Sequence, residues 1–137
     1  MTRRFYLDTS IWRDYYENRN DKFRPLGEWA LKFIQQCLEN NYFILYSDFL
    51  IEELETAYQR PEISQIFEIA TKILHKVTIT PSQKKEAALL CKERKVSWGD
   101  ALHAILARDN RATIISRDEH FLYLTDIAEV RKPEELI

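Results

Sequence analysis

The feature that most constrains the fold is a series of short apolar runs separated by longer stretches of helical periodicity. The runs cover residues 5–7, 42–46, 77–79, 112–115 and 126–130. The first, second and fourth are continuous rather than alternating, which is typical of strands covered on both faces. Strands joined by helices need crossover connections, so the sequence predicts an α/β fold with a parallel sheet.

The stretches between these runs carry apolar residues at helical spacing. Thr80 and Gln83 form a capping box with a proline at position 81, which marks a helix start. The predicted helices cover residues 29–38, 48–57, 63–74, 80–91 and 97–108, and a further helix starts near residue 10.

Composition narrows the class of protein. A chain of 137 residues with 45% hydrophobic residues suits one domain, which we expect to cover residues 1–137. A net charge of only −2 disfavours a protein that wraps nucleic acid by bulk charge, but it does not exclude a local nucleic-acid-binding site. Two glycines exclude a Rossmann fingerprint and a P-loop, and two cysteines cannot build a disulfide framework or a zinc cluster. No run is long enough to span a membrane and no signal peptide opens the chain, so we expect a cytosolic protein.

Polar residues stand directly after the predicted strands. Asp8 follows the first run, Ser47 the second, and Ser116, Arg117 and Asp118 the fourth. Ligands of open parallel sheets bind outside the carboxyl ends of the strands. We therefore expect these side chains to share one edge of the sheet.

Two further carboxylates lie in predicted helices. Glu53 shares a helix face with apolar residues, whereas Glu52 points to the solvent side. A carboxylate on an apolar stripe is costly unless its charge is compensated, which singles out Glu53. Asp100 aligns with His103 and small residues, so its helix could lie close to the sheet and bring the carboxylate near the strand ends.

Each acid also has an ordinary structural explanation. Asp8 could cap a helix, and Asp100 could complete a capping box with Ser97. Asp118 could begin a turn, and Glu53 could be a marginally exposed helix residue. Four carboxylates at one edge, however, would repel one another unless cations neutralised them. Hard oxygen ligands select Mg²⁺ or Mn²⁺, and such a site suits phosphoryl transfer.

Four segments in order resemble the PIN domain family, the nuclease fold of VapC-type toxins. They are Tyr-Leu-Asp-Thr-Ser at 6–10, the stretch 47–54, Gly-Asp-Ala-Leu-His-Ala at 99–104, and the stretch 114–121, followed by a family-like ending at 130–136. The resemblance implies a five-stranded parallel sheet between helices and a Mg²⁺- or Mn²⁺-dependent ribonuclease site. The family's acidic quartet falls on Asp8, Glu53, Asp100 and Asp118. Its supporting hydroxyl falls on Ser116, and Thr9 matches the hydroxyl after the first aspartate.

The resemblance also implies partners: an RNA substrate, an antitoxin protein and a second copy of the chain. Arg13 and Arg117, which are close in sequence to two of the aspartates, are predicted phosphate contacts or else plain surface. The aromatic stretch could form a docking groove for an antitoxin helix, part of the core, or a homodimer interface. Its members are Trp12, Tyr15, Tyr16, Phe23 and Trp29. The alternative function is a non-catalytic module that binds metal or a partner.

The remaining motifs are weaker evidence for a function. The three histidines are scattered; we interpret His103 as a packed or partly exposed side chain and His120 as support for Asp118. Asp8-Thr9-Ser10 lacks the second aspartate that phosphatases of the haloacid dehalogenase type require at position 10, so we reject that chemistry.

Overall fold

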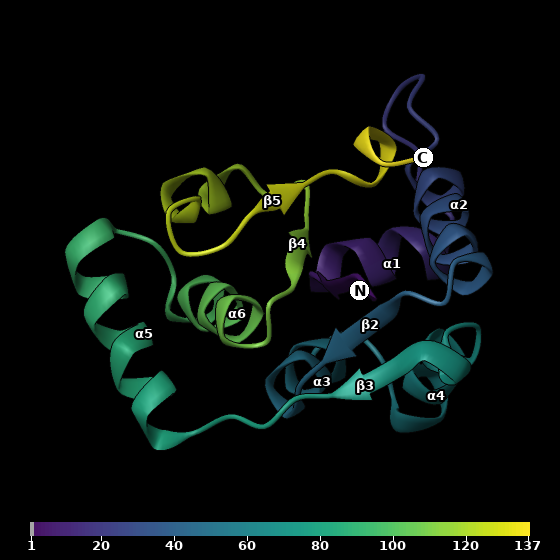
Figure 1. The fold of residues 1–137 in the computed structure, drawn as a ribbon. Helices are drawn as coiled ribbons and strands as arrows, with labels where there is room; N and C mark the ends of the chain where they lie inside the picture. Colours follow the sequence, from purple (N-terminus) through teal and green to yellow (C-terminus); the bar gives the residue numbers. More distant parts are fainter. Residues whose placement is uncertain (1) are drawn as a thin grey trace.

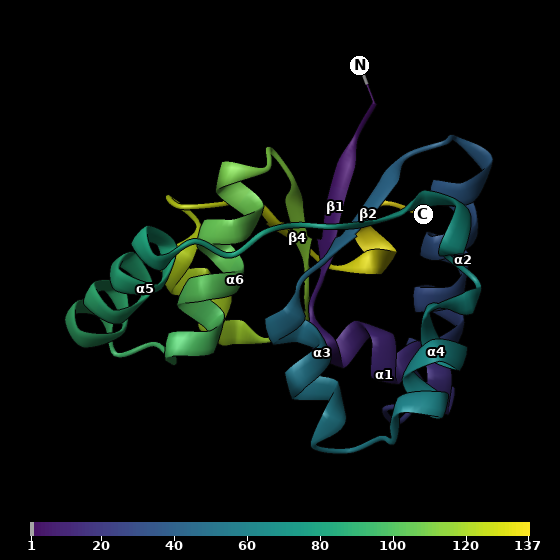
Figure 2. The same ribbon diagram turned by 90° about the horizontal axis from the view of Figure 1, so that it is seen from below.

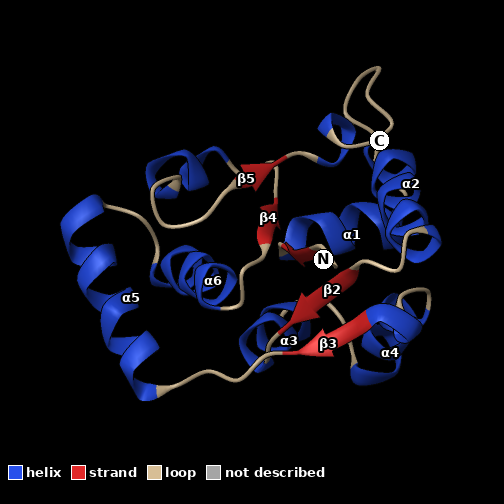
Figure 3. Ribbon diagram, viewed as in Figure 1, coloured by secondary structure: helices blue, strands red, loops and turns tan. Residues whose placement is uncertain are grey.

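The computed structural model describes residues 2–137 and contains one five-stranded sheet (Figures 1 and 3). All strand pairings are parallel, in the order β3-β2-β1-β4-β5. The strands are β1 (Arg4–Leu7), β2 (Phe43–Tyr46), β3 (Leu74–Lys76), β4 (Thr113–Ile115) and β5 (Val130–Arg131). The predicted α/β class with a parallel sheet is therefore confirmed.

Helices cover both faces of this sheet. In Figure 2, α5 and α6 lie on one side of the strands, and α1, α2 and α4 lie on the other. The helices are α1 (Thr9–Glu17), α2 (Leu26–Glu39), α3 (Asp48–Glu55), α4 (Arg60–Glu68), α5 (Pro81–Arg94) and α6 (Trp98–Asp109), with short 3₁₀ turns at Thr71–Ile73, Glu119–Leu124 and Pro133–Glu135. Among the described residues, no helix is both long and apolar enough to cross a bilayer.

Two apolar cores result, one on each face of the sheet. Along β1, Tyr6 faces the core that contains α6, while Phe5 and Leu7 face the core that contains α1 and α2. Side chains alternate between the faces of a strand, and both faces here are buried. This is why the first apolar run is continuous rather than alternating.

The third strand and its preceding helix differ from the prediction. The helix ends at Glu68 rather than near residue 74, and a 3₁₀ turn leads directly into β3. The apolar pattern continues past the helix end because Ala70 and Ile73 enter the core from the turn. The strand consequently occupies residues 74–76, with Leu74 paired to Ile44, rather than residues 77–79.

The fifth strand is also shorter than predicted. Only Val130 and Arg131 are strand residues paired with β4, whereas residues 126 and 127 belong to a turn. The amides of Ile127 and Ala128 donate to the carbonyl of Leu124, so these groups are used within the turn. Apolar character alone could not distinguish this buried turn from a strand.

Candidate active site

The register of the two central strands creates the site. Leu7 pairs with Ile115, and the Asp8 amide continues the ladder by donating to the Ile115 carbonyl at 2.9 Å. The residues that follow the two strands therefore lie side by side. The Ser116 hydroxyl donates to Asp8 Oδ2 at 3.0 Å, across 108 residues of sequence.

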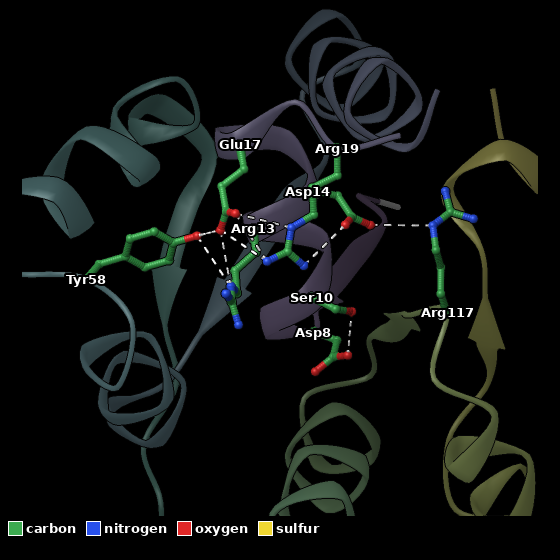
Figure 4. A network of polar contacts seen from close by, with 8 residues as sticks. All are labelled: Asp8, Ser10, Arg13, Asp14, Glu17, Arg19, Tyr58 and Arg117. Atoms are coloured by element: carbon green, nitrogen blue, oxygen red, sulfur yellow. Dashed lines mark hydrogen bonds and ion pairs between the residues drawn. The ribbon is translucent and has the colours of Figure 1, made fainter. Parts of the chain in front are cut away.

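Asp8 is buried and held by three donors. Oδ1 accepts from the Thr9 amide at 2.8 Å, and Oδ2 accepts from the Ser10 and Ser116 hydroxyls at 2.9 and 3.0 Å; Figure 4 shows the Ser10 contact. Burial raises the pKa of Asp8, and the neighbouring charge of Glu53 adds to the effect. The hydroxyl donors act in the opposite direction, because they stabilise the charged form.

Glu53 reaches the same edge from α3, and its side chain is about one-third exposed. Its Oε1 accepts from the Thr9 hydroxyl at 2.8 Å and lies 2.6 Å from Nε2 of His103. Burial alone would raise the pKa of Glu53, but the hydrogen bond and charge of His103, together with Thr9, lower it overall. Glu52 is exposed, which agrees with the choice between the two glutamates made from the helix face.

Gly99, at the start of α6, gives Glu53 room. A Cβ at position 99 would lie 3.0 Å from the Phe49 ring and 3.5 Å from Glu53 Oε2. The first of these distances is too short for an ordinary contact. A side chain here would therefore require the Phe49 ring to shift.

Asp100, Asp118 and His120 form the more open part of the site. One possible ligand atom from each lies within 4.8 Å of the others. Burial raises the pKa of Asp100, followed by repulsion from the charges of Asp118 and Asp8. Asp118 is oriented by its amide, which donates to Ser116 Oγ at 3.0 Å, and by the His120 amide, which donates to Asp118 Oδ1 at 2.9 Å. His120 Nδ1 also lies 2.9 Å from Asp118 Oδ1, so this histidine supports Asp118 as expected.

These groups fit a hard divalent cation. The donors of the quartet are all carboxylate oxygens, which Mg²⁺ and Mn²⁺ prefer. The pKa of Asp100 is raised first by burial and then by the negative charges of Asp118 and Asp8, and a cation would relieve that repulsion. An open hollow lined by Asp118, His120 and Tyr123 adjoins the cluster and leaves space for a substrate. The structure places Asp100 and Asp118 within reach of one ion, and Asp8 lies near enough for its charge to act on Asp100. Glu53 in turn acts on Asp8, while Thr9 and Ser116 donate to Glu53 and Asp8 respectively.

The two arginines are already paired with carboxylates of the protein (Figure 4). Arg117 Nη1 donates to Glu134 Oε2 at 2.7 Å, its Nε lies 3.5 Å from Asp14 Oδ2, and its guanidinium lies over the Trp29 ring. These contacts hold it inside the protein, so we leave Arg117 out of the proposed site.

Arg13 is more exposed. Its Nε lies 3.4 Å from both Glu17 Oε2 and the Tyr58 hydroxyl, which itself donates to Glu17. Its predicted phosphate contact stays a prediction.

The aromatic stretch does not form one surface. Trp12 is fully buried and packs edge-on against Phe67, so it belongs to the core. Tyr15, Tyr16 and Trp29 are half-buried, whereas Phe23 is fully exposed. A docking groove would have to use the exposed part alone.

Sequence reasoning missed the role of His103. Its ring is 1% exposed and makes hydrogen bonds through both nitrogens, to Glu53 and to Tyr6. His103 follows Asp100 by three residues and therefore shares its helix face. This spacing could have predicted that His103 lies close to the acidic residues.

Comparisons with known proteins agree with this fold. A model of the PIN domain family matches residues 5–127. The VapBC2 complex of Rickettsia felis bound to a promoter DNA fragment is 14% identical, with a TM-score of 0.69 and coverage of 94% of this chain and 98% of that chain. A toxin–antitoxin complex from Klebsiella pneumoniae is 21% identical (TM-score 0.62; 93% and 96% covered), and FitAcB from Neisseria gonorrhoeae is 13% identical (TM-score 0.62; 96% and 99% covered).

At these identities the solved structures establish the fold alone. No curated protein matches the sequence. The family model, in contrast, spans most of the chain and includes all four carboxylates of the site. The chain belongs to the PIN domain family.

Proposed function

We propose that this protein is a divalent-metal-dependent ribonuclease and the toxin of a type II toxin–antitoxin pair. The observation that carries the proposal is the convergence of Asp8, Glu53, Asp100 and Asp118 at the carboxyl edge of the sheet. Burial and, after it, repulsion from Asp118 and Asp8 raise the pKa of Asp100, and a bound cation would relieve the repulsion. Membership of the PIN family supports nuclease chemistry in particular.

The chain's own groups divide the work at such a site. Asp100 and Asp118 would hold the cation, which we propose to be Mg²⁺ or Mn²⁺, with Asp8 fixed beside them by its three donors. A divalent ion there would supply charge neutralisation for a phosphodiester and activation of water. Ser116 keeps Asp8 and Asp118 in register, because its hydroxyl donates to one and accepts from the amide of the other.

The choice of RNA rests on the resemblance to VapC-type toxins. A net charge of −2 supports a local site rather than an extended basic surface. Arg13 remains a proposed phosphate contact.

The proposed partner is an antitoxin protein. Two of the solved structures described above are a VapBC2 complex and a toxin–antitoxin complex. Exposed apolar side chains that a partner could cover include Leu122 and Tyr123, beside the acidic site, and Phe23. Formation of a homodimer and a cytosolic location remain predictions.

The test is cleavage of a labelled single-stranded RNA with Mn²⁺ by the wild type and by the double variant Asp8→Asn/Asp100→Asn. The Glu52→Gln variant, which changes an exposed glutamate next to Glu53, is the matched control. We expect cleavage by the wild type and the control, loss of cleavage in the double variant, and loss on addition of a chelator. Equal activity in the double variant would overturn the proposal.

The same experiment tests the alternative of a non-catalytic module. An inactive wild type that still binds Mn²⁺ at these carboxylates would favour the module. Calorimetric titration with Mn²⁺ provides that second measurement.

A further inference from the structure

A chain of buried polar side chains runs through the apolar core and ends at Glu53. The Ser47 hydroxyl lies 2.7 Å from the Tyr6 hydroxyl, which lies 2.8 Å from Nδ1 of His103. His103 Nε2 lies 2.6 Å from Glu53 Oε1. The other three members of this hydrogen-bonded series are Ser47, Tyr6 and His103. They are at most 1% exposed, and they come from the end of β2, from β1 and from α6 respectively.

The chemistry of the groups assigns a direction to the chain. An ionised carboxylate only accepts hydrogen bonds, so His103 must donate from Nε2 to Glu53. In a neutral ring, Nδ1 then accepts from the Tyr6 hydroxyl, and the Tyr6 oxygen accepts from Ser47. Ser47 Oγ accepts in turn from the Leu50 amide at 3.2 Å, which also caps α3, the helix that carries Glu53. Every hydrogen in the chain is used.

The chain leaves the two oxygens of Glu53 in different environments. Oε1 accepts from both Thr9 and His103, whereas Oε2 accepts no hydrogen bond from any residue that the structure describes. We propose that Ser47, Tyr6 and His103 are positioning residues that fix Oε1 to the protein and present Oε2 alone to the metal site. This inference rests on the proposed metal-dependent function, and it assigns to that function residues that do not touch the site themselves.

Simple packing does not explain these residues. Buried polar groups cost free energy unless all of them are paired, and an apolar core at these positions would avoid the requirement. Phenylalanine at position 6 would fill the same space between the sheet and α6. Residues that orient metal ligands in this way commonly change metal affinity or activity by about 10- to 100-fold when they are removed.

The experiment compares two substitutions at position 103. His103→Gln retains an N–H donor for Glu53, whereas His103→Leu fills similar space without one. Mn²⁺ affinity is measured without RNA, by water-proton relaxation, and RNA cleavage is measured as kcat and KM. Circular dichroism and thermal unfolding confirm that each variant is folded, and Tyr6→Phe provides an independent, milder variant that removes one oxygen.

We expect His103→Leu to weaken Mn²⁺ binding and lower kcat by about tenfold or more with little change in KM. His103→Gln should restore both to within about threefold of the wild type, which a purely structural role would not predict. Tyr6→Phe should lower kcat in the same sense but by less. Equal Mn²⁺ affinity in His103→Leu and the wild type, or equal losses in the Leu and Gln variants, would overturn the inference.

A third measurement does not depend on activity. Long-range ¹H–¹⁵N spectra of the wild type report which nitrogen of His103 carries a proton, and we expect a proton on Nε2. A ring protonated on Nδ1 alone would overturn the inference. If the wild type cleaves no RNA, the proposed function fails, while the spectra and the Mn²⁺ affinities still test the positioning of Glu53.

Discussion

The two halves of the acidic site are built differently. Asp8 and Glu53 are surrounded by donors from Thr9, Ser10, Ser116 and His103. Asp100, by contrast, has its pKa raised by burial and by the negative charges around it. Burial raises the pKa of Asp8 as well, but its hydroxyl donors offset part of that rise, whereas repulsion from Asp118 and Asp8 adds to the rise at Asp100.

This difference separates positioning from binding. Hydrogen bonds to a carboxylate fix its direction but also satisfy its lone pairs, which leaves fewer for a metal. Carboxylates that repel one another gain most when a cation arrives. Removal of a donor to Asp8 should therefore lower stability, whereas removal of the Asp100 charge should raise it, although both changes lower activity.

The largest expected effect is that of Asp100→Asn, in the open half. It should lower RNA cleavage by about a hundredfold or more, because a ligand of the metal is lost. It should also raise the unfolding temperature in EDTA at neutral pH. A carboxyl whose pKa is raised on folding destabilises the folded state as pH rises from the ordinary value through the raised one, and asparagine removes that loss.

Thermal unfolding in EDTA across pH, with Glu52→Gln as control, measures this effect. The stabilisation by Asp100→Asn should disappear in acid, where the carboxyl is protonated in both the folded and unfolded states. A variant less stable than the wild type at neutral pH would contradict the division into two halves.

Ser116→Ala tests the other half. The change removes the donor to Asp8 and the acceptor for the Asp118 amide. We expect a loss of about 1–3 kcal/mol in the free energy of unfolding, because buried partners are left unpaired. Urea unfolding measures it, with Ser82→Ala, an exposed serine of α5, as the control. No loss of stability would show that Asp8 does not depend on these donors.

A smaller effect is expected at the ion cluster that Arg117 forms with Asp14 and Glu134. Burial alone would raise the pKa of Glu134, but the hydrogen bond and charge of Arg117 contribute to lowering it overall. Its stabilising contribution is therefore present above the ordinary glutamate pKa and lost as pH falls through the lowered value. We expect Glu134→Gln to lower the free energy of unfolding by about 1 kcal/mol at neutral pH.

Urea unfolding at neutral and acidic pH, with exposed Glu39→Gln as control, measures this contribution. The difference from the wild type should shrink in acid, and kcat should stay within about twofold, because the cluster lies outside the proposed site. A large loss of kcat in Glu134→Gln without a loss of stability would show that Arg117 contributes to the proposed site.

Arg13→Gln should have the smallest effect. Its side chain is about one-third exposed and already pairs with Glu17 and Tyr58, so a phosphate contact there would be weak. We expect KM for RNA to rise by about two- to threefold at low salt, with kcat unchanged. An unchanged KM, measured beside the exposed control Arg60→Gln, would remove Arg13 from substrate binding.

Much of the fold could be predicted from local pattern. Continuous apolar runs located β1, β2 and β4, and the capping box at Thr80 and Gln83 located the start of α5. The third and fifth strands were misplaced because apolar residues continue from helix or strand into buried turns. Periodicity reports burial, and buried turns are apolar too.

The sequence by itself also singled out the acids of the proposed site. Asp8 and Asp118 follow strands that end at the same edge, and the burial of one helix face separated Glu53 from Glu52. These are local properties of single strands and helices. A resemblance spread over the whole chain then connected them to one family.

Only the tertiary structure decided how those acids are held. Tyr6 on β1 reaches His103 on α6 across 97 residues of sequence, and Ser47 at the end of β2 reaches Tyr6 across 41 residues. Arg117, close in sequence to Asp118, turns instead toward Asp14 and Glu134. The direction of a long side chain depends on which partners from distant segments are packed around it, and a linear pattern does not contain that information.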